Sequence, residues 1–399
     1  MKVIRMNEIS PKSKCCGCGA CVDKCPTKSI QMKQDEKGFV YPSIEQKTCI
    51  DCGLCKKACP MINDVSLHKT LNAYASSSKD CQLSKSSSSG GGFATIAKYI
   101  LAEGGIVFGS AYLQNFEVGV VEISSLQDLY KLQGSKYVQS NMVGAFTKIQ
   151  KQLEDGKKVL FCGTGCQVGA LRCFLQKEYD NLFLIDLVCH GVPNNKMFND
   201  YLRLIEKKQG KTIKEYYFRD KTYDQDKKGL IFFENGTKKR DFPYKSSYYS
   251  LFLERKILRD SCYSCKFSAP LRGGDITLCD FWGVGIEAPE YLKDVKAQGL
   301  KGISGVLVNT KKGGELFRNI KEDLCFLEVD AEQIRRHNRN LVSPSKATNE
   351  RNTIFELYQK GGYIAVDKYF HKKNRFKILL KNVYYKSPKF LKKIIARKR

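Results

Sequence analysis

Apolar residues recur along most of the chain with either the period of a β-strand or the period of an α-helix, and segments of the two kinds alternate. A spacing typical of strands occurs at Ile106–Tyr112, Val118–Ile123, Lys158–Cys162, Leu182–Cys189 and Gly305–Asn309. The spacing of a helix occurs at Phe93–Leu101, Leu126–Leu132, Met142–Leu153, Cys166–Gln176, Lys196–Lys207 and Glu315–Leu324. Because strands and helices alternate from Gly105 onward, this region is expected to form an α/β domain.

Two further regions are predicted to form hairpins. Ser29–Ile44 contains Gly38 and is expected to be a short hairpin. Thr212–Arg240 is β-like, and Asn235-Gly236 marks a tight turn within it.

The composition indicates a folded chain with more than one domain. Its 399 residues exceed the usual size of one compact core. With 42% apolar and 11% aromatic residues, it has enough hydrophobic material for a packed interior, which excludes a disordered protein. Met1–Lys14 lacks the apolar run of a signal peptide, and no stretch reaches the roughly 18 apolar residues of a membrane span. We therefore expect a cytoplasmic protein.

The 18 cysteines carry the strongest chemical signal. The spacing C-x2-C-x2-C-x3-C-P occurs twice, at Cys15, Cys18, Cys21 and Cys25 and again at Cys49, Cys52, Cys55 and Cys59. In bacterial two-cluster ferredoxins, three close thiolates of this motif bind one [4Fe–4S] cluster and the fourth binds the other. We therefore assign Cys15, Cys18, Cys21 and Cys59 to cluster one and Cys49, Cys52, Cys55 and Cys25 to cluster two, which leaves Cys16 as a spare.

Zinc is the alternative ligand for these cysteines. Zinc sites rarely use C-x2-C-x2-C, and they give no reason for the repeated Cys-Pro ending. Iron–sulfur clusters are therefore favoured over zinc, and a disulfide framework is disfavoured in a reducing cytosol.

A serine- and glycine-rich segment, Lys85–Phe93, precedes the first helix of the α/β region. Composition alone is typical of a flexible linker. The alternative is a phosphate site, because serines can cap a helix and glycines let a ligand approach its N-terminus.

Four other cysteines lie at the ends of predicted elements, where α/β folds bind ligands. Cys166 lies at a strand-to-helix turn, Cys189 at a strand end, and Cys262 and Cys265 form a C-x2-C pair beside Arg259. Cys81, Cys173, Cys279 and Cys325 lie within helical or strand-like runs, where cysteine is more often a small buried hydrophobe.

An ordered series of motifs resembles a known family. After the two quartets come Ser-Ser-Ser-Gly-Gly (87–91), Gly-Ser-Lys-Tyr-Val-Gln-Ser (134–140), Gly-Thr-Gly-Cys-Gln (163–167), Cys-His-Gly-Val-Pro (189–193), Phe-Arg-Asp-Lys (218–221), Cys-Tyr-Ser-Cys (262–265) and Asp-Phe-Trp-Gly (280–283). Together they resemble the beta subunit of coenzyme F-420 hydrogenases and dehydrogenases, a family that includes 7-hydroxymethyl chlorophyll a reductase. The resemblance covers roughly residues 10 to 340.

The resemblance implies an iron–sulfur oxidoreductase that contains FAD. It supports a third [4Fe–4S] cluster at Cys166, Cys189, Cys262 and Cys265, and flavin contacts from Ser87, Ser88, Ser89, Gly90, Gly91, Ser135 and Lys136. Lys136 would offset the charge of reduced flavin, or is simply an exposed loop lysine. His190 would donate a proton to substrate, or has a structural role.

Two departures from the family pattern matter. Gly165 replaces the usual proline before Cys166, which is expected to loosen that turn. Members that use the deazaflavin often carry Gly-Trp after the Phe-Arg-x-Lys segment, whereas here Gly229-Leu230 follows at a distance. The resemblance therefore does not extend to a deazaflavin substrate.

The C-terminal tail is strongly basic. The chain has 68 Lys and Arg against 41 Asp and Glu, and thirteen of the basic residues lie between Lys368 and Arg399, where no acid occurs. Apolar residues recur there at helical spacing, so the tail is either a segment that binds an anionic membrane surface or a solvated basic terminus. Nucleic acid is disfavoured as a partner, because no recognised binding fold accompanies the charge.

These observations predict an α+β protein with three parts. Residues 1–66 would form a two-cluster ferredoxin-type domain, residues 67–345 an α/β flavin and iron–sulfur domain, and residues 346–399 a basic extension. The expected function is an oxidoreductase that moves electrons between [4Fe–4S] clusters and a flavin to reduce a small-molecule acceptor, with a protein as its electron donor or acceptor. The alternative is an electron-transfer subunit of a larger complex with no substrate of its own.

Overall fold

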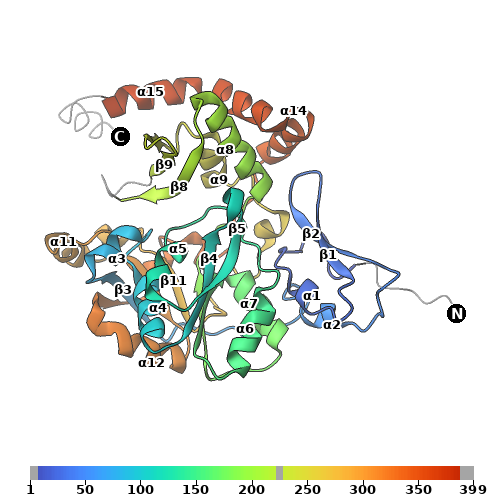
Figure 1. Cartoon of the computed structure of the whole chain (residues 1–399). Coiled ribbons are helices and arrows are strands. Elements are labelled where there is room, and N and C mark those ends of the chain that lie inside the picture. Colours follow the sequence, from blue (N-terminus) through green and yellow to red (C-terminus); the bar gives the residue numbers. More distant parts are fainter. Residues whose placement is uncertain (1–7, 222–227, 387–399) are drawn as a thin grey trace.

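The structure, a computed structural model, describes residues 8–221 and 228–386. A small N-terminal segment lies at the side of the molecule (Figure 1). It consists of α1 (Ala20–Asp23), β1 (Ile30–Gln34), β2 (Val40–Ile44) and α2 (Leu54–Lys57). Strands β1 and β2 are antiparallel, with Ile30 opposite Ile44, so the predicted hairpin is confirmed.

The body of the protein is built on an eight-stranded mixed sheet with the order β13-β3-β12-β11-β7-β6-β4-β5. Its strands are β3 (Asn72–Ser78), β4 (Ile106–Tyr112), β5 (Val118–Ile123), β6 (Val159–Thr164), β7 (Leu182–Leu187), β11 (Ile276–Asp280), β12 (Ser304–Val308) and β13 (Leu324–Val329). Strands β4, β6, β7 and β11 are parallel, whereas the strands at both edges pair antiparallel.

Helices cover both faces of this sheet because its central strands are apolar on both sides. On one face, α4 (Gly92–Ala102) and α12 (Lys311–Ile320) pack over Val107 and Leu160. On the other face, α6 (Ala145–Glu154) and α7 (Gly165–Leu175) pack over Phe108 and Phe161. The predicted alternation of strands and helices is therefore confirmed for this domain.

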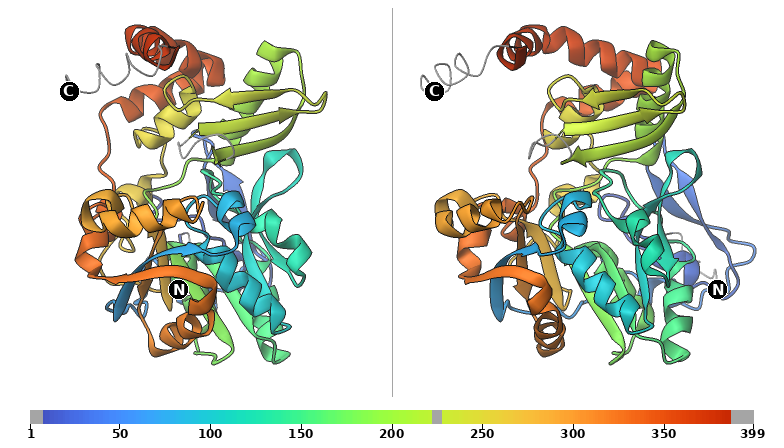
Figure 2. Two further views of the ribbon diagram at one scale, coloured as in Figure 1. Left: turned by 90° about the vertical axis from the view of Figure 1, so that its left-hand side faces the viewer. Right: turned by 60° about the vertical axis from the view of Figure 1, so that its left-hand side comes forward.

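A second core lies above the large sheet in Figures 1 and 2. It combines the three-stranded sheet β10-β9-β8 with long helices. Its elements are β8 (Ile213–Asp220), β9 (Lys228–Phe233), β10 (Lys238–Asp241), α8 (Asn195–Gln209), α9 (Ser247–Leu253) and α14 (Glu350–Lys373). Helix α15 (Arg375–Lys386) follows α14 at the edge of this layer.

Shorter elements connect these layers. They are α3 (Cys81–Ser86), η1 (Gln114–Phe116), η2 (Leu126–Asp128), α5 (Leu129–Leu132), η3 (Asp260–Ser264), α10 (Val284–Glu287), α11 (Pro289–Ala297), η4 (Lys321–Asp323), α13 (Ala331–Arg335) and η5 (Arg339–Leu341). Among the helices of the described ranges, none has the length and apolar character to cross a bilayer.

Two features of the fold differ from the expectation. Strands β3, β11 and β13 were not among the predicted strands, although they form half of the large sheet with β12. In addition, the basic extension predicted at residues 346–399 begins with α14, whose Ile354, Phe355 and Phe370 are buried in the second core. Residues 387–399 of the basic tail lie outside the described residues.

Candidate functional site

The two cysteine quartets of the N-terminal segment surround two separate cavities. Cys15, Cys18, Cys21 and Cys59 line one cavity of about 320 Å³ with its open mouth, and Cys25, Cys49, Cys52 and Cys55 line another of about 330 Å³ measured in the same way. Each cavity takes three cysteines from one motif and one from the other, as the assignment from spacing requires. Gly17, Gly19 and Gly53 have positive φ angles of 66°, 82° and 72°, which lets the loops curl around the cavities. Four converging thiols fit the ligand set of a [4Fe–4S] cluster.

A much larger cavity, about 1440 Å³ with its open mouth, lies at the carboxyl ends of parallel strands. Ser110 of β4, Thr164 of β6 and Leu187 of β7 line it, as do residues 134–140. Open α/β sheets bind ligands at this edge. Cys16 and Cys18 of the N-terminal segment also line it, so this segment faces the cavity.

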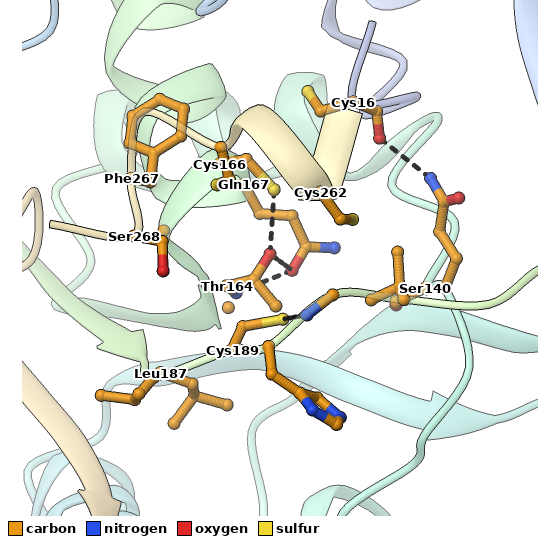
Figure 3. Close-up of a pocket in the computed structure, with 18 of the residues that line it drawn as sticks. Cys16, Ser140, Thr164, Cys166, Gln167, Leu187, Cys189, Cys262, Phe267 and Ser268 are labelled. Carbon is orange, nitrogen blue, oxygen red and sulfur yellow. Dashed lines mark hydrogen bonds between the residues drawn. The ribbon is translucent and has the colours of Figure 1, made fainter. Parts of the chain in front are cut away.

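The third group of cysteines converges in the same cavity (Figure 3). Cys166 is the second residue of α7, Cys189 follows β7, and Cys262 and Cys265 lie in and directly after η3. The fold thus brings together the four residues that the sequence singled out. Burial raises the pKa of Cys189 to about 12 and that of Cys265 to about 11, so free thiols here would be protonated and poor nucleophiles at neutral pH. Among the described residues no three such side chains are placed to hold a single metal ion, so an iron–sulfur cluster is the group that these four cysteines would bind.

The turn before Cys166, where Gly165 replaces the proline usual in the family, is held by two contacts. Thr164 caps α7 through a capping box, in which its backbone N–H donates to Gln167 Oε1 at 2.9 Å. A Cβ on Gly165 would lie 2.9 Å from Cβ of Phe267, so the glycine makes room for this ring against α7. The cap and Phe267 thus hold the turn around Gly165.

Cys16 is not a spare residue in the structure. Its thiol interacts with the thiols of both Cys166 and Cys18. It therefore lies between the first quartet and the third cysteine group. The sequence contained no signal for this role, because the contact joins two segments that are far apart along the chain.

Arg259 holds the N-terminal segment against the body. It is fully buried and donates to Val40 O at 2.8 Å, Gln139 Oε1 at 2.9 Å and Cys15 O at 3.3 Å. It also lies 4.5 Å from the ring centroid of Tyr41. Burial raises the pKa of the Cys15 thiol and the charge of Arg259 opposes that rise, so Arg259 offsets thiolate charge at the first quartet.

Lys136 and Ser135 line the large cavity, as expected for residues that contact a flavin. Lys136 Nζ donates to the backbone carbonyls of Ser110, Lys131 and Gln133 at 2.9 to 3.0 Å. Burial lowers its pKa to about 7. Lys136 is therefore a positioned group rather than a solvated loop lysine.

The segment Ser87–Gly91 does not line this cavity, contrary to the expected flavin contacts. The N-cap of α4 is Gly91, so no serine caps the helix, and a Cβ on Gly90 would collide with Ser76 O at 2.3 Å. The loop is instead packed against β3 and anchored by Lys221, which donates to the carbonyls of Ser84 and Ser89. Of its side chains, Ser88 has a direct link to the cavity wall, because its Oγ accepts from the Ser135 N–H at 2.7 Å.

His190 lines the cavity beside Cys189. Its ring lies edge-on to Phe252 with centroids 4.4 Å apart, and burial lowers its pKa to about 4. The imidazole is therefore neutral at physiological pH and carries one N–H donor. Its place on the cavity wall is compatible with contact to a substrate, and its packing on Phe252 is compatible with a structural role.

Comparison with known proteins agrees with these sites. Residues 14–62 match the 4Fe-4S dicluster domain. Residues 156–333 match the C terminus of the beta subunit in the coenzyme F-420 hydrogenase/dehydrogenase family.

Individual relatives cover parts of the chain. The F subunit of F(420)H(2) dehydrogenase from Methanosarcina mazei is 24% identical over 223 residues, which are 50% of this chain and 61% of that protein. Ketoisovalerate oxidoreductase subunit VorC of Methanothermobacter marburgensis is 35% identical over 57 residues, 14% of this chain and 72% of that protein. A chain of the F-420-reducing [NiFe] hydrogenase complex from Methanosarcina barkeri is 18% identical with a TM-score of 0.44, covering 79% of this chain and 96% of that chain.

The matched ranges contain the cysteine motifs described above. Both quartets lie within residues 14–62, and all four cysteines of the third group lie within residues 156–333. This chain spans less than two thirds of the Methanosarcina mazei protein. Its residues 156–333 belong to the C-terminal family of coenzyme F-420 hydrogenase/dehydrogenase beta subunits, and its residues 14–62 form a 4Fe–4S dicluster domain, which makes it an iron–sulfur electron-transfer protein.

Proposed function

We propose that this chain is a flavin-dependent iron–sulfur oxidoreductase of the cytoplasm that reduces a small-molecule or metabolite acceptor. One observation carries the proposal: the three cysteine groups follow one another from the surface to the large cavity. Cys52 of the second quartet is exposed, the first quartet is more buried, and Cys16 connects it to Cys166. Such an order suits electron transfer between a partner at the surface and a reaction in the cavity.

The three cysteine groups would each hold one [4Fe–4S] cluster. The ligands are the two quartets as assigned from spacing, together with Cys166, Cys189, Cys262 and Cys265. When bound, clusters carry single electrons and a flavin converts them to the two-electron reductions that organic acceptors need. Arg259 supports this assignment, because a buried guanidinium beside Cys15 favours anionic ligands.

The large cavity would hold the FAD. Ser135 and Lys136 are proposed to contact it directly, and Ser88 is proposed to fix the Ser135 backbone. Ser140 also supports a polar ligand, because its buried Oγ lines the cavity and has no hydrogen-bond partner in the described part of the protein. Ser87, Ser89, Gly90 and Gly91 do not line the cavity, and we propose that they act only by holding the loop that carries Ser88.

Lys136 and His190 are the proposed catalytic residues. The ammonium of Lys136 would stabilise negative charge on the reduced flavin ring. The neutral His190 imidazole would donate a hydrogen bond from its N–H to the acceptor, since it borders the cavity beside the third cysteine group.

A protein partner would dock near the second quartet. Ile50 and Cys52 are exposed there, and the exposed lysines Lys28, Lys47, Lys56 and Lys57 are close in sequence to the quartet's cysteines. Basic side chains around an exposed apolar residue favour an acidic electron carrier.

A second candidate function is an electron-transfer subunit with no substrate of its own. The relatives from Methanosarcina mazei and Methanothermobacter marburgensis are named as subunits, which supports this alternative. In that case the large cavity would serve a partner enzyme.

The test uses the full chain purified without oxygen and a reduced bacterial ferredoxin as electron donor. We expect rapid bleaching of flavin absorbance in the wild type and at least tenfold slower bleaching in Cys52→Ala. Cys81→Ala is the matched control, because Cys81 is also exposed but lies outside all three groups. Equal rates in Cys52→Ala would contradict the proposed path.

A second step separates the two functions. Turnover of small-molecule acceptors by the isolated chain supports the enzyme. Turnover that requires an added partner protein supports the electron-transfer alternative.

A further inference from the structure

Helix α15 presents its apolar residues to solvent. Phe376, Leu379, Leu380 and Val383 are 79%, 59%, 70% and 59% exposed. Their spacing of three and four residues places them on one face of the helix. An exposed apolar stripe of this kind marks an interaction surface.

The opposite face of α15 is attached to the protein. Ile378 packs against the second core, and Asn382 Oδ1 accepts from the Tyr244 hydroxyl at 3.1 Å. Lys377 forms an ion pair with Glu254 at 3.5 Å. The helix is therefore oriented with its apolar face outward, the reverse of an ordinary surface helix.

Helix α14 connects this surface rigidly to the body. Asp367 binds Lys208 at 2.6 Å and Ser247 at 2.7 Å, and Phe370 is buried in the second core. Figure 1 shows α15 on a different side of the molecule from the N-terminal segment, so a large partner on α15 leaves the second quartet accessible.

Charge identifies the kind of partner. From Lys368 to Arg399 the chain has thirteen basic residues and no acidic one. A second copy of this chain would meet the same positive charge, and a nucleic acid backbone would leave the apolar stripe uncovered. An anionic lipid surface satisfies both features, because it attracts basic residues and accepts apolar side chains by shallow insertion.

We propose that α15 is an amphipathic anchor that binds the protein peripherally to an anionic bilayer surface. The apolar face of Phe376, Leu379, Leu380 and Val383 enters the headgroup boundary, while the surrounding basic residues contact lipid phosphates. The proposal is independent of the reaction catalysed in the large cavity.

The test is co-sedimentation of the full chain with vesicles at low salt. We expect binding to vesicles that contain phosphatidylglycerol and at least tenfold weaker binding to vesicles of phosphatidylcholine alone. Leu380→Glu is expected to weaken the first interaction at least tenfold. The matched control is Ile286→Glu, because Ile286 of α10 is 76% exposed and lies outside the tail. This control is expected to bind like the wild type.

Two further measurements keep the proposal open to refutation. In Phe376→Trp, the added fluorescence should shift to shorter wavelength with anionic vesicles and stay unchanged without them. A chain that ends after Asn374 keeps α14 whole and should lose vesicle binding while it retains iron. Equal sedimentation of Leu380→Glu and wild type would overturn the proposal. The proposal would also be overturned if the wild type self-associates without lipid and Leu380→Glu converts it to a monomer. The apolar stripe would then bind a second copy of the chain.

Discussion

Replacement of Arg259 by methionine should loosen the N-terminal segment from the body. The buried guanidinium donates to Cys15 O, Val40 O and Gln139 Oε1, and it lies over the rings of Tyr41 and Phe39 at 4.5 and 5.1 Å. Methionine keeps the length of the side chain but leaves the three acceptors without this donor. The contacts with Cys15, Val40, Tyr41 and Phe39 join the body to the N-terminal segment, so their loss should weaken the interface between these two parts.

The magnitude follows from these contacts. A buried polar group without a partner costs about 1–3 kcal/mol, and each cation–π contact contributes roughly 0.5–2 kcal/mol. Because water can replace part of the loss, we expect local opening of the segment to become easier by about 3–4 kcal/mol. That change corresponds to roughly a hundred- to a thousandfold increase in the opening equilibrium.

Hydrogen exchange measured by mass spectrometry checks this prediction. Amides of β2 should exchange faster by that factor in Arg259→Met, whereas amides of β6 in the large sheet should not change. Arg203→Met is the matched control, because the Arg203 side chain on α8 is exposed. If β2 keeps wild-type protection in Arg259→Met, the argument that Arg259 holds the segment is wrong.

Three further predictions concern the cavity. Cys262→Ala with Cys265→Ala should remove about one third of the iron, since one of three clusters is lost, whereas Cys279→Ala should not; an unchanged iron assay would exclude these ligands. Lys136→Met should lower the flavin midpoint potential by roughly 30–60 mV at pH 6. Because the pKa of Lys136 is about 7, its charge is lost above that pH, so spectroelectrochemistry at pH 9 should show little difference; a difference independent of pH would contradict this role. Cys16→Ala should retain its iron but lower a cluster potential by on the order of 30 mV in an EPR redox titration, because a thiol donor to a neighbouring ligand is lost; an unchanged potential would argue against it.

Short-range spacing explains what could be predicted from the sequence. The loop geometry of C-x2-C-x2-C depends on neighbouring residues, so the quartets and their exchange of Cys25 and Cys59 were accessible without a structure. The third group was accessible for a different reason. Its members lie at element ends, and the carboxyl ends of parallel strands meet at one edge of a sheet.

Other features depend on contacts between distant segments. Strand β3 reads Asn-Ala-Tyr-Ala-Ser-Ser-Ser, which has no strand-like alternation, and it is a strand because β12 and β13 pair with it on both sides. Cys16 and Arg259 acquire their roles only when the N-terminal segment docks on the body. The serines before α4 had the composition of a cap, but their loop is held by β3 and Lys221 instead.

Native mass spectrometry of the full chain, purified without oxygen, measures directly how many clusters and flavins one chain holds. We expect one species whose added mass equals three [4Fe–4S] clusters and one FAD, because there are three cysteine groups and the cavity beside the third group is the proposed FAD site. A chain that carries zinc instead of iron, or one with two clusters and no flavin, would contradict it.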